Sequence, residues 1–458
     1  MILQSLNPAT GEKIQSYPLM SLVEVEKTLD HVQEDFISWR QTNFKQRALF
    51  LKKAVEVMLT KKKEYARLMA VEMGKPIQQG VSEIEKCALG CEYYIEHAEN
   101  FLKPELVETD AFRSYITYEP LGIVLAIMPW NFPFWQVFRF AAPTLMAGNG
   151  VVLKHAANVS GCALAIEKIF QEAGFPKNIF RTLIIDNHQV AAVINHPFIK
   201  AVTLTGSTAA GKAVAAQAGQ ALKKVVLELG GSDPFIVLAD ADLDKAVEAG
   251  VKSRLNNAGQ SCIAAKRFIV VDSIRESFEN KIVEAMKSIK MGNPLDEKTE
   301  MGPLARFDLR EVLNRQVQSS VAQGAKIILG GEIPKQTGAY FPPTVLTEVK
   351  KGMPAYEEEL FGPVAAIIPV KDEKEALFVA NDSSFGLGAT LFTRDIIHAE
   401  QIAVKEIEAG SCFINGVVKS DPRLPFGGIK NSGYGRELSC LGIKEFVNIK
   451  TIHITNSR

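Results

Sequence analysis

Short apolar runs alternate with helical segments along most of the chain after Trp130. Four runs, VVLKH, RTLII, AVTLTG and KVVLEL, have the composition of buried strands, and helical patterns separate them. Consecutive parallel strands need such helices, because each strand must return to the same edge of the sheet before the next one begins. The alternation therefore predicts an α/β fold built on a doubly wound parallel sheet of the Rossmann type.

A second alternating series begins near Pro234. Its apolar runs are PFIVLA, RFIVVD, KIILGG, AAIIPV, ATLFT and SCFING. A chain of 458 residues is too long for one hydrophobic core and should divide into two or more domains. The second series is therefore predicted to form a second α/β domain.

The two ends of the chain have different patterns. About the first hundred residues are predicted to be helical, with a capping box at Ser21 and Glu24 and longer helical patterns over 44–73 and 82–102. From residue 113 the strings RSYITYEP and LGIVLAI indicate strands. The C-terminal EFVNIKTIHIT indicates a long strand, whose edge is predicted to pair with another domain or subunit.

Charge and composition limit the partners of the chain. The 52 Lys and Arg residues balance 52 Asp and Glu, so no basic field favours nucleic acid or an anionic membrane. The most apolar stretch, 121–148, is interrupted by three prolines, Asn131 and Arg139, and we expect no transmembrane segment. The N-terminus shows no secretory or transit pattern. A small-molecule partner is the default expectation.

The six cysteines form no CxxC pair, which argues against a zinc site and against a disulfide framework. We therefore expect no metal and a reducing, cytoplasmic location.

Cys262 is the candidate nucleophile. It follows Gly259, Gln260 and Ser261 in NNAGQSCIAAKR, a polar and flexible setting, whereas a packed cysteine usually has apolar neighbours. A thiol with a pKa of about 8.5 must be activated before it attacks at neutral pH. A structural cysteine is the alternative when the string is taken alone.

Glu228 is the candidate general base. It ends the run VVLEL, at the carboxyl end of a predicted parallel strand, where open α/β sheets place their ligands. A carboxyl group after apolar residues and before Gly230 and Gly231 is partly desolvated, which raises its pKa and suits it to proton abstraction. The alternative is a strand-end glutamate in an ion pair.

Asn131, in MPWNFPFWQVFRFAAP, is predicted at the start of a helix that runs to about Met146. Its side-chain amide can cap that helix or donate a hydrogen bond to an oxyanion. Taken alone, the string favours capping.

Two further strings suggest a phosphate site. TLTGSTAAG places Gly206 and Ser207 between a predicted strand and a helix, where backbone N–H groups can hold a phosphate. Lys154, at the end of VVLKH, adds a cation. The string is not the GxGxxG fingerprint, and an ordinary turn and a solvated lysine remain open.

These strings, together with EEELFGPV and LPFGGIKNSGYGRE, resemble the NAD(P)-dependent aldehyde dehydrogenase superfamily in order and over essentially the whole chain. Within it the chain is most similar to short bacterial succinate-semialdehyde dehydrogenases, which carry the string KSDPRLPFGG, here residues 419–428. The resemblance implies oxidation of an aldehyde to the free acid.

The resemblance also assigns roles to residues. Cys262 would attack the aldehyde, the Asn131 amide and the Cys262 N–H would hold the oxyanion, and Glu228 would activate water to hydrolyse the thioester. The residues implied to bind the cofactor are Trp130, Lys154, Ala157, Gly206, Ser207, Glu359 and Phe361.

Position 157 bears on the choice of cofactor. NAD-preferring relatives usually carry a glutamate three residues after the lysine, and this chain has Ala157. Without that carboxylate a 2′-phosphate is not repelled, and Lys154 can attract it. We therefore expect NADP, or use of both NADP and NAD.

Arg139 bears on the choice of substrate, because it matches a carboxylate-binding arginine of succinate-semialdehyde dehydrogenases. If the helix continues, Trp135 lies on the same face. A second arginine of some relatives is replaced by Asn256, so Ser261 and Ser420 are the expected hydroxyl donors. The alternatives are a structural ion pair for Arg139, and glutarate semialdehyde or a broad range of aliphatic aldehydes as substrates.

The resemblance implies three structural units. They are a cofactor-binding domain (1–111 and 121–229), a catalytic domain (230–425) and a small β oligomerisation arm (112–120 and 426–458). Such arms usually extend a neighbouring subunit's sheet, so we expect a homodimer or a homotetramer.

Overall fold

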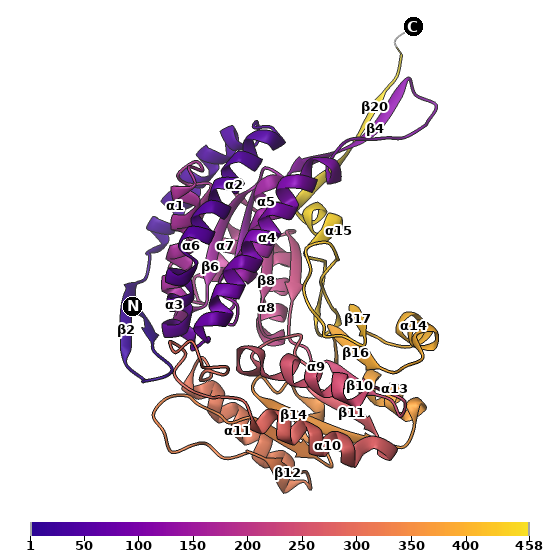
Figure 1. Ribbon diagram of the computed structural model, residues 1–458. Helices are drawn as coiled ribbons and strands as arrows, with labels where there is room; N and C mark the ends of the chain where they lie inside the picture. Colours follow the sequence, from indigo (N-terminus) through magenta and orange to yellow (C-terminus); the bar gives the residue numbers. More distant parts are fainter. Residues whose placement is uncertain (1, 457–458) are drawn as a thin grey trace.

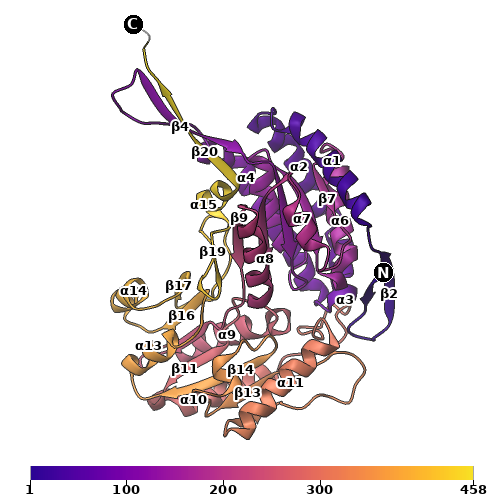
Figure 2. The same cartoon turned by 180° about the vertical axis from the view of Figure 1, so that it is seen from behind.

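The computed structural model describes residues 2–456, and its first sheet has six strands in the order β19-β9-β8-β5-β6-β7 (Figures 1 and 2). The strands are β5 (Ile123–Met128), β6 (Gly150–His155), β7 (Phe180–Thr182), β8 (Ile199–Thr205), β9 (Lys224–Glu228) and β19 (Gly433–Tyr434). All pairings are parallel except that of β19 with β9. The predicted parallel sheet is confirmed.

Helices cover both faces of this sheet because β5 is apolar on both sides. Val124 and Ala126 pack into the core formed with α2 (Phe44–Thr60), α4 (Ile77–Phe101), α5 (Trp135–Met146) and α6 (Ser160–Glu172). Ile123 and Leu125 pack on the other side, against α1 (Leu22–Trp39), α7 (Val190–Asn195) and α8 (Thr208–Gln220). Alternate residues of a strand face opposite sides of its sheet, so the core pattern gives the doubly wound arrangement.

The second sheet has seven strands in the order β12-β13-β14-β11-β10-β16-β17. They are β10 (Pro234–Val237), β11 (Arg267–Val271), β12 (Lys326–Leu329), β13 (Thr344–Thr347), β14 (Val364–Val370), β16 (Gly388–Phe392) and β17 (Ser411–Ile414). Its helices are α9 (Leu243–Leu255), α10 (Asp272–Lys287), α11 (Phe307–Ala322), α13 (Glu373–Asn381) and α14 (Ile396–Lys405). The predicted second α/β series is confirmed, whereas β13, only four residues long and preceded by two prolines, was not predicted.

The N-terminal region departs from the prediction in two places. Residues 2–18 form an antiparallel hairpin of β1 (Ile2–Leu6) and β2 (Lys13–Pro18), whose mixed polar sequence gave no strand signal. The predicted helix over 44–73 is two helices, because the chain leaves helical geometry at Lys61 before α3 (Lys62–Met73). The capping box of α1 is confirmed: Ser21 Oγ accepts from the Glu24 N–H, and the Glu24 carboxylate accepts from the Ser21 N–H.

A three-stranded arm extends from the body of the molecule (Figures 1 and 2). It consists of β20 (Val447–Ile454), β4 (Arg113–Pro120) and β3 (Glu105–Leu106), all antiparallel, with β20 at one edge. Apolar side chains are exposed on it at Leu106, Phe112 and Ile449. The C-terminal strand is confirmed, and one of its edges pairs within the chain.

The remaining short elements are β15 (Phe385–Gly386), β18 (Ile429–Lys430), α12 (Pro354–Glu357) and α15 (Ser439–Ile443). Within residues 2–456, none of the helices is both long enough and apolar enough to cross a bilayer. The six cysteines are free thiols. The cytoplasmic location stays a prediction.

Candidate active site

Cys262 lies where two cavities meet. One cavity, of about 270 Å³, is bordered by α4, α5 and the loop after β17. The other, of about 260 Å³, is bordered by the carboxyl ends of β5, β8 and β9. Cys262 and Gln136 line both. A group held in either cavity can therefore reach the same thiol.

The loop before Cys262 has an unusual backbone. Asn257, Ala258 and Gly259 have φ values of 54°, 52° and 74°, in the left-handed region that costs non-glycine residues of order 1 kcal/mol each. Gly259 is required, because a Cβ there would collide with the carbonyl oxygen of Gly362. The Asn257 amide donates to the Asn131 carbonyl at 2.7 Å and ties this loop to the segment before α5.

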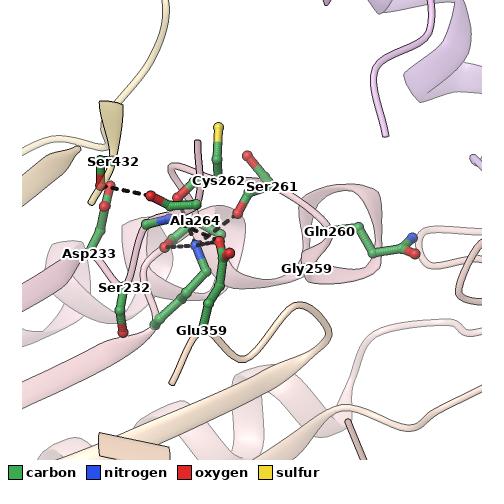
Figure 3. A network of polar contacts seen from close by, with 12 residues as sticks. Ser232, Asp233, Gly259, Gln260, Ser261, Cys262, Ala264, Glu359 and Ser432 are labelled. Atoms are coloured by element: carbon green, nitrogen blue, oxygen red, sulfur yellow. Dashed lines mark hydrogen bonds and ion pairs between the residues drawn. The ribbon is translucent and has the colours of Figure 1, made fainter. Parts of the chain in front are cut away.

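Lys266 fixes the backbone that carries Cys262. Its ammonium group is buried and donates to the carbonyls of Ser261 at 2.9 Å and Cys262 at 2.7 Å. It also forms an ion pair with Glu359 at 3.3 Å. Figure 3 shows the Cys262 sulfur pointing away from this network. The cation therefore fixes the loop while the thiol stays accessible.

Burial raises the pKa of the Cys262 thiol to about 12, and the positive charges of Arg139 and Lys266 only partly offset that effect. At neutral pH the free protein thus holds Cys262 as the neutral thiol. Nucleophilic attack requires a base or a bound group that stabilises the thiolate.

Asn131 does not cap a helix, so the helix start predicted there is wrong. The helix α5 begins at Trp135, and the Glu83 carboxylate accepts from the N–H groups of Phe134 and Trp135 at its first turn. One N–H of the buried Asn131 amide donates to the Gln260 carbonyl at 3.1 Å. Asn131 and Cys262 line the same cavity, and among the described residues the Asn131 amide donates to no second acceptor. Helix capping is excluded, and the oxyanion role stays a prediction.

Glu228 ends β9 and is almost completely buried. Within residues 2–456 neither carboxylate oxygen has a hydrogen-bond partner. Burial, followed by the neighbouring charge of Glu437, raises its pKa well above the ordinary value, although Arg139 and Arg436 oppose this. A carboxyl group that resists ionisation and lies near Cys262 is suited to proton transfer.

The Glu228 side chain is packed against Gly427, where any Cβ would lie 2.8 Å from its Oε1. It lines neither cavity. To act on a group bound to Cys262, the carboxyl must therefore turn about its side-chain torsions.

The second cavity brings together most of the residues predicted to bind the cofactor. Trp130, Gly206, Ser207, Glu359 and Phe361 line it. The Trp130 and Phe361 rings meet edge to face with centroids 5.7 Å apart, and Ser207 is the N-cap of α8. A Cβ at Gly230 would run into the Glu359 carboxylate, so glycine is needed for this cradle. An aromatic wall beside a helix N-terminus fits a dinucleotide.

Lys154 and Ala157 lie at the end of β6 and just after it. They are not lining residues of the second cavity. The Lys154 ammonium donates to Asn187 Oδ1 at 2.8 Å, and within the described chain it has no ion-paired carboxylate. Ala157 adds no anion, and the negative charge of Asp186 acts on Lys154 without forming an ion pair. This charge distribution fits a phosphorylated ribose better than an unphosphorylated one.

The first cavity contains all the residues predicted to bind the substrate: Trp135, Arg139, Ser261 and Ser420. Trp135 and Arg139 are on α5, four residues apart, as predicted. Arg139 is buried and forms an ion pair with buried Glu437, and its guanidinium lies 4.9 Å from the centre of the Phe426 ring. The carboxylate that we expected the substrate to supply is thus supplied by the protein, which is the structural alternative stated above.

Sequence reasoning missed several residues of the site. Glu437 belongs to the string LPFGGIKNSGYGRE, but nothing in that string shows which cation it pairs with. Lys266 follows Cys262 by four residues, a spacing that could have drawn attention to it. Gln136 and Lys86 gave no signal, because their place in the site depends on how α4 and α5 pack. Within residues 2–456, no cluster of three or more His, Cys, Asp or Glu side chains could hold a metal ion.

Comparison with known proteins identifies the family of the chain. The aldehyde dehydrogenase family matches residues 2–452, and the chain belongs to this family. It is 51% identical to a probable NADP+ succinate-semialdehyde dehydrogenase of Synechocystis, over 99% of this chain and 100% of that protein. It is 50% identical to the NAD(P)+ succinate semialdehyde dehydrogenase Sad of Escherichia coli, over 98% and 97% of the two chains.

Among solved structures, the chain resembles the succinic semialdehyde dehydrogenase of Streptococcus pyogenes in complex with NADP+. The TM-score is 0.97 and the sequence identity 38%, over 99% of this chain and 100% of that one. The predicted aldehyde dehydrogenase fold and activity are confirmed.

The raised pKa of Cys262 gives a testable pH dependence in the free protein. Far below its pKa, the thiolate fraction of a thiol grows tenfold for each pH unit. The rate of Cys262 alkylation by iodoacetamide should therefore rise about tenfold per unit from pH 7 to about 9.5. Peptide mass spectrometry measures this rate, with Cys262→Ser as the control. A plateau below about pH 9 would contradict the burial effect.

Proposed function

We propose that the protein oxidises succinate semialdehyde to succinate through a thioester on Cys262, with NADP+ as the preferred electron acceptor. The observation that carries the proposal is the place of Cys262 between two cavities of different chemistry. One has cations, an indole and hydroxyls, which suit a carboxylated aldehyde. The other has the aromatic wall and helix N-terminus that suit a dinucleotide. The names of the relatives at 50% and 51% identity support the same substrate.

In the first step the Cys262 thiol releases its proton to solvent, and the thiolate attacks the aldehyde carbon. A C–S bond forms and the carbonyl oxygen becomes an oxyanion. The unpaired N–H of the Asn131 amide and the Cys262 backbone N–H donate to this oxyanion. Removing one such donor typically costs 10²–10³ in rate. Because Asn257 and Gln260 fix the Asn131 segment, the donor is in place before the substrate arrives.

NADP+ held by the residues of the second cavity would accept the hydride, and with it two electrons, from the substrate carbon, which leaves a thioester on Cys262. Glu228 then takes a proton from water, and the water oxygen attacks the thioester carbon. The C–S bond breaks, the carboxylic acid leaves and the proton returns to the thiolate. Only the ionised carboxylate can take this proton, and the raised pKa of Glu228 makes that carboxylate a stronger base than an ordinary glutamate. Its presence disfavours a CoA-acylating reaction, in which the thioester must survive.

The preference for NADP+ rests on Lys154 and Ala157. A cation without a paired carboxylate attracts the 2′-phosphate, and alanine leaves space without repulsion. Ala157 offers no hydroxyl to the phosphate, so NAD+ remains a usable acceptor.

The arm supports the further proposal of a homodimer or homotetramer. In the isolated chain β20 is an edge strand, and Ile449 on it is 62% exposed. An exposed edge with apolar side chains is a common pairing surface. We also propose that the two large sheets mark a cofactor-binding and a catalytic domain, divided near Gly230.

Initial rates of NADPH and NADH formation with succinate semialdehyde, glutarate semialdehyde and butanal test the proposed function. We expect kcat/KM for succinate semialdehyde to exceed that for butanal at least tenfold, about 1.4 kcal/mol of transition-state discrimination, and to be higher with NADP+ than with NAD+. Cys262→Ala should be inactive. Equal or faster oxidation of butanal would instead indicate a broad aliphatic aldehyde dehydrogenase, and faster oxidation of glutarate semialdehyde a longer substrate.

Light scattering on a sizing column tests the assembly. We expect the mass of two or four chains at micromolar concentration, and a shift towards the monomer when Ile449 is replaced by Lys, because a charge would be buried in the new pairing. A monomer in the wild type would refute the proposal.

A further inference from the structure

The first cavity contains a cation that was not predicted from the sequence and that has no role in the proposed mechanism. Lys86, on α4, lines the cavity with Cys262, Trp135 and Ser420. Its ammonium group donates to Ser420 Oγ at 2.7 Å and lies 4.4 Å from the centre of the Trp135 ring. Among the described residues, no carboxylate forms an ion pair with it. The direct contacts of its ammonium group are an indole face and a hydroxyl.

The other cations of the cavity are either paired with a carboxylate or exposed to solvent. Arg139 is already neutralised by Glu437. Lys252 and Lys419 are exposed at the rim, and Lys419 lies 4.0 Å from Asp421. Solvent screens a charge at the rim, whereas a partly buried charge without a counterion attracts an anion more strongly. Among the cations of this cavity, Lys86 is therefore the one that should attract an anion most strongly.

The hydrogen bonds of Ser420 also indicate a site for an anion. Its Oγ accepts from Lys86 Nζ and also from the Trp135 indole N–H, at 3.0 Å. A serine hydroxyl has two lone pairs and one proton, so both lone pairs are in use. Its own O–H must donate to a third group. The site thus presents an ammonium and a hydroxyl donor side by side, which is the chemistry that binds a carboxylate.

We propose that Lys86 binds the carboxylate of the substrate together with the Ser420 hydroxyl, while Arg139 serves mainly to hold Glu437. This inference rests on the proposed function, in which the substrate is a carboxylated aldehyde. It makes Lys86 a specificity-determining residue: Trp135 orients its ammonium group, and the carboxylate replaces the counterion that the protein does not provide.

The charge state of Lys86 agrees with this role. Burial and the positive charge of Arg139 lower the pKa of Lys86 to about 8, although Cys87, Glu83 and Asp421 oppose the shift. An anion bound beside the ammonium would favour its charged form.

Lys86→Met tests the inference, because methionine keeps much of the side chain's length and removes its charge. We expect kcat/KM for succinate semialdehyde to fall at least tenfold, mainly through KM, whereas kcat/KM for butanal changes less than twofold. Lys86→Arg should recover part of the loss. Lys252→Met, which removes an exposed rim cation of the same cavity, is the matched control and should change neither substrate more than twofold. The Kd for NADP+, measured by protein fluorescence, should stay unchanged in all three variants.

A second readout does not depend on turnover. The inhibition constant of succinate against the aldehyde should rise at least fivefold in Lys86→Met, because the product carries the same carboxylate. If Lys86→Met slows both aldehydes equally, Lys86 is structural, and if it slows neither, another group binds the carboxylate. Either result overturns the inference. If the wild type itself does not prefer succinate semialdehyde to butanal, the proposed function fails first, and the two failures are thereby distinguished.

Discussion

The ammonium group of Lys266 holds the backbone that carries Cys262. It is buried, donates to the carbonyls of Ser261 and Cys262, and pairs with Glu359 from the loop before β14. Loss of Glu359 would leave the buried ammonium of Lys266 without its ion-paired carboxylate, which is costly for a buried charge. Both cavities depend on this arrangement, since Glu359 lines the cofactor side and Ser261 the substrate side. The thiol can therefore serve two ligands from one fixed position.

A second buried group of charges lies behind the site. Arg139 pairs with Glu437, and Glu437 in turn raises the pKa of Glu228. One arginine between two carboxyl groups cannot neutralise both, so the pKa of Glu228 stays raised and its ionised form is a strong base. The same arginine favours the thiolate of Cys262. The proton balance of thiol and base is thus coupled through Arg139, whatever its role towards the substrate.

Patterns local in sequence predicted much of the fold and the site. The parallel strands were readable because strands buried on both faces are continuous apolar runs, and Cys262 and Glu228 because glycines surround them. The β1–β2 hairpin and β13 were missed, since their residues carry neither alternation nor a long apolar run. Asn131 was misplaced at a helix start because Glu83, 48 positions earlier in the chain, caps α5 instead. Lys86 and Glu437 join the site only through tertiary packing, which spacing cannot reveal.

In the proposed reaction Cys262 carries the acyl group and Glu228 releases it. The most direct measurement is the intact mass of Glu228→Gln after mixing with succinate semialdehyde and NADP+, followed by peptide mapping. We expect the mass of one added succinyl group, located on Cys262, with one NADPH formed per chain. A variant that stays unmodified while it turns over, or that is acylated at another residue, would contradict it.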